Sequence, residues 1–334
     1  MKKYNRFIQL IRNIVYGYST PCCIGVDINY DSIKLVELCQ NTMVIANYSI
    51  NSNKINILEK SSLLIENIAN IINYEWSNFT KKYDHAAIKI SHADIIIKEL
   101  IIPSAVSEFD INDYLHNLLI QELGIENIDF DYNIIKSDEV QQLVYVVIAK
   151  KEKIEDCYAL MELAGVKVAA IDVDIFALER LFAIILKKNY ITNDVLIVDI
   201  ERDYIKIYMI NDYKIIYSDI LKITYLDLIF EKFTTAEQQH ISKQISVDIT
   251  KLIKNMYLNS SIHNLSHSNN CFLYLMGANS VIYGLSEEII NSGVIDSCWF
   301  IDELFPTQPI VKSRAEFMQL ITAIALATWG HDFA

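Results

Sequence analysis

A short acidic segment that occurs twice constrains the fold of this chain more than any other feature. The first copy, Asp-Ile-Asn-Tyr-Asp-Ser-Ile-Lys, spans residues 27–34, and the second, Asp-Ile-Glu-Arg-Asp-Tyr-Ile-Lys, spans residues 199–206. Each copy follows an apolar run and leads into alternating residues that are typical of a second strand. Two copies of a strand, an acidic turn and a strand predict two related lobes with a cleft between them.

The size and composition of the chain agree with two lobes. A length of 334 residues exceeds one ordinary hydrophobic core, so two domains or lobes are expected. The chain is 52% hydrophobic and 21% charged, which is typical of a folded globular protein. Its net charge of −13 argues against broad nucleic-acid binding, because phosphate contacts need a basic surface.

The cysteines and the hydropathy pattern favour a cytoplasmic protein. The six cysteines form no C-x-x-C pair and no metal-site spacing, so we expect small buried side chains in a reducing compartment. No signal peptide is visible, and no apolar run approaches the roughly 20 residues that span a bilayer.

Periodicity and turn residues divide the chain into six segments. We expect an amphipathic N-terminal extension at 1–21, a first lobe at 22–91, an insertion at 92–150, the rest of the first lobe at 151–193, a second lobe at 194–313, and a helix at 314–330 that returns to the first lobe. Among the individual elements, we expect a strand at 42–50, a helix at 107–123 that starts with Ser107, and a mainly helical stretch at 225–259.

The first 20 residues carry apolar side chains at helical spacing with basic side chains around them. These are Phe7, Leu10, Ile11 and Ile14 on the apolar side, and Lys2, Lys3, Arg6 and Arg12 on the basic side. Such a helix can lie on an anionic membrane surface. A helix packed on the body, or a frayed terminus, is the more common arrangement and is favoured here.

Several fragments resemble the type IV pilus assembly protein PilM family, whose members are relatives of the cell-division protein FtsA. Residues 25–28 with Ser32 and Lys34 are similar to its first phosphate loop, and residues 198–200 lie where the second loop belongs. The most specific match comprises residues 163–167, 171–174 and 176–178, while residues 144–155 match a strand followed by a charged helix start. Residues 275–279 with 284–285 are similar to the adenosine motif.

The resemblance implies an α/β, actin-like two-lobe ATPase fold in which a 1C subdomain is inserted into the first lobe, 1A. It also implies a cytoplasmic scaffold that binds the N-terminal tail of the inner-membrane protein PilN beside the 1C insertion and links the membrane complex to the pilus motor ATPase. Contact with the membrane would then be peripheral, through the partner.

The cofactor that the resemblance implies is ATP with Mg²⁺. The residues that would bind it are Asp27, Asn29, Ser32, Lys34, Asp199, Glu201, Gly277, Ala278 and Asn279. Of these, Asp27 and Asp199 are the candidates for Mg²⁺, because hard cations prefer carboxylate oxygens. Candidates for partner binding near the insertion are Ile97, Leu100, Ile102, Tyr114 and Leu118. The competing interpretation is a role in the subdomain core, and it is favoured for most of these five residues. No catalytic residue is identified.

The sequence departs from the family pattern at three places in the expected nucleotide site. Asn29 and Glu201 each stand where the family has Gly after Asp-Ile, and Met276 replaces one Gly of the adenosine motif. Gly lets a backbone approach phosphates and adopt positive φ. Glu201 adds a negative charge that costs about 1–4 kcal/mol beside a triphosphate. ATP binding is therefore left open, and hydrolysis is not expected.

Other candidate sites and functions carry less weight. His263 and His267 are four residues apart in a polar loop, where a metal site is improbable. Acidic residues crowd the expected insertion, where they suit a partner peptide that carries Arg or Lys. The alternative functions are a working ATPase or small-molecule kinase, an FtsA-like membrane filament protein, and a secretion-system scaffold of the same fold.

Overall fold

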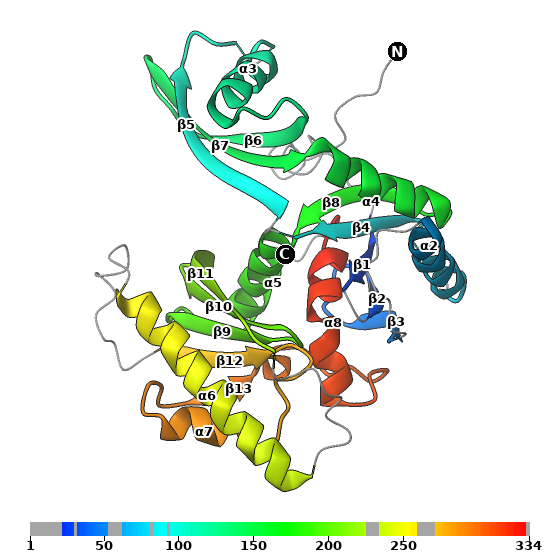
Figure 1. Cartoon of the computed structure of the whole chain (residues 1–334), viewed down its shortest axis with the longest axis vertical. Coiled ribbons are helices and arrows are strands. Elements are labelled where there is room, and N and C mark those ends of the chain that lie inside the picture. The colour runs from blue at the N-terminus through cyan, green and yellow to red at the C-terminus, as the bar shows by residue number, and fades with distance from the viewer. Residues whose placement is uncertain are drawn as a thin grey trace.

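The computed structural model of the chain describes residues 22–29, 32–52, 62–79, 83–91, 94–107, 109–224, 234–258 and 271–331. Two five-stranded sheets and their helices form a layered body, and a third, smaller sheet stands beside the body at the top of Figure 1. Several segments discussed above lie outside the described residues: the N-terminal extension, residues 225–233, and the loop with His263 and His267.

The first sheet has the strand order β3-β2-β1-β4-β8, and the second has the order β11-β10-β9-β12-β13. The strands of the first are β1 (Ile24–Ile28), β2 (Ile33–Leu38), β3 (Ile45–Asn51), β4 (His85–Ile90) and β8 (Lys167–Val173). Those of the second are β9 (Val195–Ile200), β10 (Tyr204–Asn211), β11 (Lys214–Lys222), β12 (Phe272–Met276) and β13 (Cys298–Phe300). In both sheets, three antiparallel strands are followed by two parallel ones. The prediction of two related lobes is confirmed.

The repeated acidic segment forms the same hairpin in both sheets. Asp27 on β1 is opposite Lys34 on β2, and Asp199 on β9 is opposite Lys206 on β10. The Asn29 N–H donates to the Ser32 carbonyl at 2.8 Å, and the Glu201 N–H donates to the Tyr204 carbonyl at 3.0 Å. The strands that flank the two acidic turns, and the backbone hydrogen bonds that close the turns, are therefore equivalent.

Helices cover both faces of both sheets. α2 (Ser62–Ser77) and α4 (Lys151–Leu163) pack on the outer face of the first sheet, and α6 (Thr235–Leu258) and α7 (Leu285–Asn291) pack on the outer face of the second. α5 (Asp174–Lys188) and α8 (Arg314–Ala327) lie between the two sheets (Figure 1). One hydrophobic core joins the inner faces of both sheets through these two helices, and a second core fills the space under α6 and α7.

The helix α8 approaches β1 closely enough to exclude any side chain at Gly25. A Cβ at this position would lie 2.0 Å from the Ala323 carbonyl oxygen and 2.6 Å from the Ala327 nitrogen. The C-terminal helix thus packs directly on the strand that carries Asp27, and it contacts β2 and β4 as well.

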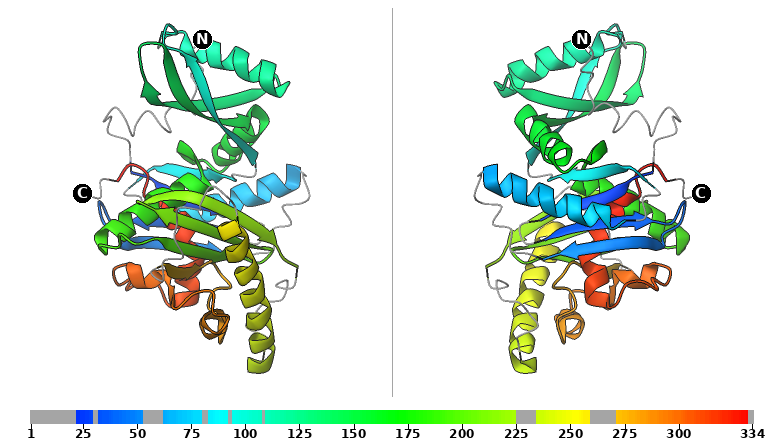
Figure 2. Two further views of the ribbon diagram at one scale, coloured as in Figure 1. Left: turned by 90° about the vertical axis from the view of Figure 1, so that its left-hand side faces the viewer. Right: turned by 90° about the vertical axis from the view of Figure 1, so that its right-hand side faces the viewer.

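The third sheet, with strand order β5-β7-β6, is inserted in the chain between β4 and α4. It comprises β5 (Ile95–Pro103), β6 (Ile128–Ser137) and β7 (Gln141–Lys150), and α3 (Ile111–Leu123) covers one face. The residues between α3 and this face form a separate hydrophobic core. Figure 2 shows the insertion standing apart from the body, which it joins at one end.

Two elements begin later than the sequence pattern predicted. β3 begins at Ile45, because residues 39–44 form a turn in which Asn41 has a φ of 55°. α3 begins at Ile111 instead of Ser107, whose carbonyl accepts the N–H groups of Asp110 and Ile111 in a preceding turn. In both cases local turn hydrogen bonds compete with the regular element.

Candidate interlobe site and partner groove

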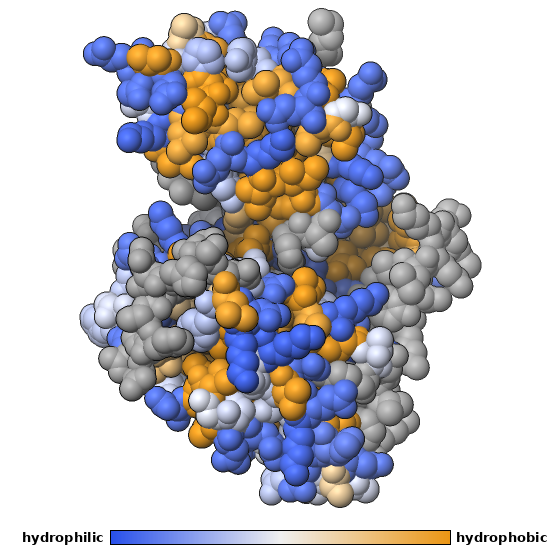
Figure 3. All heavy atoms as spheres, turned by 60° about the vertical axis from the view of Figure 1, so that its left-hand side comes forward, coloured by the Kyte–Doolittle hydropathy of each residue, from blue (hydrophilic) through white to orange (hydrophobic). Residues whose placement is uncertain are grey.

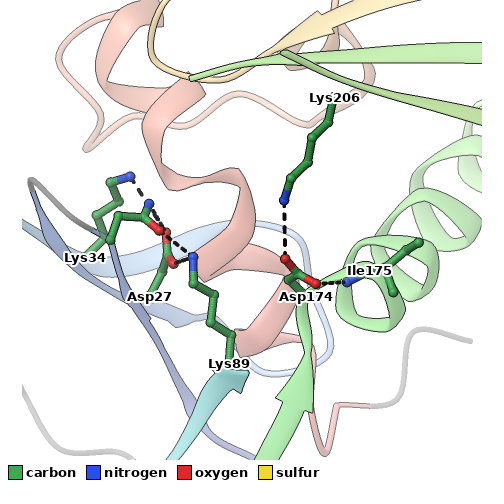
Figure 4. Close-up of polar contacts among 7 residues, drawn as sticks. Asp27, Lys34, Lys89, Asp174, Ile175 and Lys206 are labelled. Carbon is green, nitrogen blue, oxygen red and sulfur yellow. Dashed lines mark hydrogen bonds and ion pairs between the residues drawn. The ribbon is translucent and has the colours of Figure 1, made fainter. Parts of the chain in front are cut away.

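The carboxyl ends of β1 and β9 bring buried charged side chains to one place between the lobes. Asp27, Lys34, Asp199 and Lys206 are all less than 9% exposed. Lys89 from β4 and Asp174 from the start of α5 join them, and Figure 4 shows these two residues with Asp27, Lys34 and Lys206. The sequence pattern did not single out Lys89 or assign a role to Asp174.

Asp27 is held by two lysines and an amide. The Lys89 Nζ lies 2.5 Å from Asp27 Oδ1, and the Lys34 Nζ lies 3.7 Å from Asp27 Oδ2. The Asn29 side-chain amide donates to Asp27 Oδ2 at 3.0 Å, while its Oδ1 accepts a hydrogen bond from Lys89. Asn29 therefore connects the carboxylate and the lysine through its side chain.

The pKa values of this pair show how strongly the charges interact. Burial raises the pKa of Asp27, but Lys89 and Lys34 more than offset this effect, so its pKa lies below the ordinary value. Burial lowers the pKa of Lys89, but Asp27, Asp174 and Glu201 raise it above the ordinary value. Both side chains are therefore charged at neutral pH.

Asp199 has the equivalent position in the second lobe but a different environment. Burial raises its pKa to about 6, an effect that Lys206, Lys34 and Lys89 only partly offset. Its Oδ1 is buried without a hydrogen-bond partner among the described residues. Lys206 reaches instead toward Asp174 Oδ2, at 3.4 Å, and this contact joins the two lobes.

Asn29 and Glu201, which stand where the family has Gly, do not need the positive φ that Gly allows. The described non-glycine residues with positive φ are Asn41, Tyr190, Asp212 and Tyr213, so neither Asn29 nor Glu201 uses the left-handed region. Asn29 acts through its side chain. Glu201 adds a carboxylate that faces Lys89 from the second lobe.

The adenosine-motif residues lie directly against the second turn. Gly277 has a φ of +92°, and a Cβ there would lie 2.5 Å from Asp199 Oδ1. The Asn279 N–H donates to the Ile200 carbonyl at 3.0 Å, Asn279 is buried and Ala278 is half-buried. The structure thus brings together all nine residues expected at the cofactor site, among them Ser32, whose carbonyl closes the first turn.

The side chains present are a poor fit to Mg²⁺ with a nucleotide. Both Asp27 oxygens already face a cation, whereas Mg²⁺ would need a carboxylate oxygen at about 2.1 Å and several waters. In the described residues, no group of three or more His, Cys, Asp or Glu side chains is placed to hold a metal ion. The lysines that would face phosphate are already paired with aspartates.

A second candidate site is the face of the inserted sheet that α3 does not cover. Paired residues of neighbouring strands share a face, which places Ile97 with Val147, Glu99 with Tyr145, and Ile101 with Leu143. Val147 is buried in the core of the body, so this face is turned toward the body, while Ile97 and Ile101 remain 39% and 66% exposed.

We refer to Ile97, Ile101, Leu143, Tyr145 and Phe176 as the partner groove. Phe176 of α5 contacts the Tyr145 ring with centroids 6.3 Å apart. Figure 3 shows apolar side chains on the insertion and in the hollow between it and the body. Burial raises the pKa of the Tyr145 hydroxyl, and the carboxylates of Glu179 and Glu99 raise it further.

The five residues expected to bind a partner are divided between the two faces of the inserted sheet. Leu100 and Ile102 are 8% and 1% exposed in the core under α3, and Leu118 packs against that core, so the competing core interpretation holds for them. Tyr114 is 38% exposed on α3. Only Ile97 lies in the partner groove. Alternate residues of a strand face the same side, so the sequence could have placed Ile101 on the same face of β5 as Ile97.

The fold and the charged turns define the class of protein. Two sheets of the same strand order, with an acidic hairpin turn from each meeting between them, are the hallmark of the actin-like ATPase fold. The chain belongs to the type IV pilus assembly protein PilM family, whose model matches residues 25–221.

Solved structures agree with this fold. The structure of a PilM-PilN type IV pilus biogenesis complex aligns with a TM-score of 0.68 at 15% identity, covering 93% of this chain and 99% of that chain. The ethanolamine utilization protein EutJ from Carboxydothermus hydrogenoformans aligns with a TM-score of 0.50 at 14% identity, covering 96% and 93%. A search of proteins with curated functions finds no match. Among the described residues, no helix has the length and apolar character needed to cross a membrane.

Proposed function

We propose that this protein is a cytoplasmic scaffold of a type IV pilus assembly complex that binds the N-terminal tail of a PilN-like inner-membrane protein. The observation that carries the proposal is the partner groove, an apolar surface of the insertion that faces the body and remains partly exposed. Exposed apolar patches of this kind, with a charged rim, commonly mark sites of protein interaction. The protein would be peripheral to the inner membrane through its partner.

The groove suits an extended tail with apolar side chains and a basic residue. Ile97 and Ile101 project from one strand face, so they offer contacts at a spacing of four residues along an extended peptide. Glu99 lies between them on the same face, and Glu179 approaches Tyr145 from α5. These two carboxylates would favour a Lys or Arg in the tail.

We further propose that the protein does not hydrolyse ATP. Support comes from the charged groups between the lobes, where Asp27 is occupied by lysines and Glu201 adds negative charge. In a phosphate-release assay, the purified protein is expected to show no turnover above background. Turnover that is lost in Asp199→Ala would contradict this part of the proposal.

The test of partner binding is calorimetry with a synthetic cytoplasmic tail of the PilN-like partner. The wild type should bind, and Ile101→Glu should weaken binding by at least about tenfold, because a charge would be buried against the apolar tail. The matched control is Val247→Glu on α6, which is 67% exposed and far from the insertion in sequence. Absence of binding by the wild type under every nucleotide condition would refute the proposal.

A further inference from the structure

The charged groups between the lobes form a cluster that contains its own cations. The cluster contains four carboxylates and three lysines, which interact with one another: Asp27, Asp174, Asp199 and Glu201, and Lys34, Lys89 and Lys206. With all of them ionised, four negative and three positive charges leave a formal charge of −1. The cluster has no excess positive charge with which to attract a polyphosphate.

We propose that Lys89 is a built-in counter-ion that takes the place of a divalent cation at Asp27, and that Lys206 joins the lobes through Asp174, so that the lobes are held together without metal or nucleotide. This inference concerns the state of the interlobe cleft and is independent of partner binding at the groove.

The two equivalent sheets provide an internal comparison for Lys89. Because Val26 is opposite Ile88, the next pair along β1 and β4 is Asp27 and Lys89. In the second sheet, the residue opposite Asp199 on β12 is Met276. One sheet thus places a lysine where the other places an apolar side chain, and the two aspartates differ accordingly in their pKa values.

The position of the Lys89 ammonium explains why it excludes a metal ion. Its side chain is only 16% exposed, and its Nζ contacts both Asp27 Oδ1 and the Asn29 side-chain oxygen. These two oxygens are the kind of donor that Mg²⁺ prefers. A cation bound to them would lie next to a buried ammonium, and at such separations like charges repel strongly in a partly desolvated site.

The contact between Lys206 and Asp174 crosses from one lobe to the other. Lys206 belongs to β10 of the second sheet, whereas Asp174 follows β8 of the first sheet and begins α5. Asp174 is fixed in place because its Oδ1 accepts the Ile175 N–H at 2.8 Å (Figure 4). Both partners are at most 10% exposed, so solvent screens the attraction little.

The first experiment compares wild type, Lys89→Met and Lys89→Arg by thermal unfolding and by calorimetry with MgCl₂ alone and with Mg²⁺-ADP. Mg²⁺ should leave the Tm of the wild type and of Lys89→Arg unchanged. Lys89→Met, which copies Met276 of the second sheet, should be less stable and should bind Mg²⁺ at least about tenfold more tightly than the wild type. A wild type that is stabilised by Mg²⁺ or Mg²⁺-ADP as much as Lys89→Met would overturn the inference.

The second experiment tests the connection between the lobes by hydrogen exchange. Because one hydrophobic core also joins the two sheets, the lobes should stay together in Lys206→Met, but exchange at the start of α5 should become faster. Lys222→Met, at the exposed end of β11, should leave this exchange unchanged. If exchange at the start of α5 in Lys206→Met matches the wild type, Lys206 does not join the lobes. Binding of the PilN-like tail is measured on the same variants. Because the partner groove does not include Lys206, tail binding should be unchanged, so a failure of this inference can be told apart from a failure of the proposed function.

Discussion

Asp27 on β1 and Asp199 on β9 occupy equivalent positions, each opposite a lysine of the next strand. Their chemistry differs because Lys89 adds a second cation to the first site, whereas Met276 provides none to the second. At the scale of single residues, the pair shows how one side chain on a neighbouring strand decides whether a buried carboxylate is stabilised or destabilised in its charged form.

The two aspartates are expected to affect stability with opposite signs. The folded state holds the Asp199 proton up to a pH of about 6, whereas an unfolded Asp releases it near 3.8, so this group lowers stability as pH rises between these values. Asp199→Asn should therefore raise the unfolding free energy above pH 6 by roughly 1–3 kcal/mol and have little effect below pH 4. Urea unfolding at several pH values measures this.

Asp27→Asn is the matched control for that experiment. Because the pKa of Asp27 lies below 3.8 in the folded state, its charged form stabilises the fold above pH 3.8, and this contribution is lost as pH falls through the folded pKa. The variant should be less stable than the wild type at neutral pH. A loss of stability in both variants at pH 7 would contradict the assignment for Asp199.

At the scale of elements, the contact of α8 with β1 connects the last helix of the chain to the strand of the first acidic turn. Gly25 belongs to the segment that resembles a phosphate loop. In the structure, however, the absence of a side chain at Gly25 leaves the space that α8 needs to pack on β1. The sequence predicted the helix and its return to the first lobe, but the function of this glycine depends on a residue almost 300 positions later.

Gly25→Ala is expected to destabilise the protein through crowding. Its Cβ would overlap the Ala323 carbonyl, so α8 must shift, at a cost of about 1–3 kcal/mol or more. The control Gly124→Ala faces open space but has a φ of +64°, which costs only about 1–2 kcal/mol in backbone strain. Thermal unfolding compares the two, and hydrogen exchange in α8 should increase only for Gly25→Ala.

At the scale of the whole molecule, the described residues form three hydrophobic cores, and the boundaries of these cores differ from those of the two lobes. The largest core joins the inner faces of both sheets through α5 and α8, whereas the inserted sheet and α3 have a core of their own. We therefore expect the body to unfold as one unit and the insertion to open separately.

Leu115→Ala tests this division, because Leu115 is fully buried under α3 in the core of the insertion. The cavity should lower the local stability of the insertion by about 2–5 kcal/mol, measured as faster hydrogen exchange in α3 and β5–β7. Exchange in the two large sheets should not change. The control Leu181→Ala on α5, in the shared core, should instead speed exchange in both large sheets.

Local patterns were sufficient to predict most elements and the duplicated hairpins. Alternation of apolar residues and the repeated Asp-Ile pair are properties of short segments, so residues such as Asp27 and Asp199 were found without a structure. Lys89 and Asp174 were missed because their importance arises from the parallel alignment of β1 with β4 and from the meeting of the two lobes. For Ile97 and Ile102, the sequence showed apolar character, and only the position of α3 shows which face of β5 is buried.

The sequence by itself determined that this protein has two related lobes with paired acidic turns, because hydrophobic periodicity and hairpin residues act over short distances along the chain. Tertiary structure alone decided that a lysine stands beside Asp27, that Lys206 crosses to Asp174, and that one face of the insertion remains open toward the body. These features depend on long-range register and packing, since charges far apart in the chain interact strongly only where folding brings them together and removes them from water.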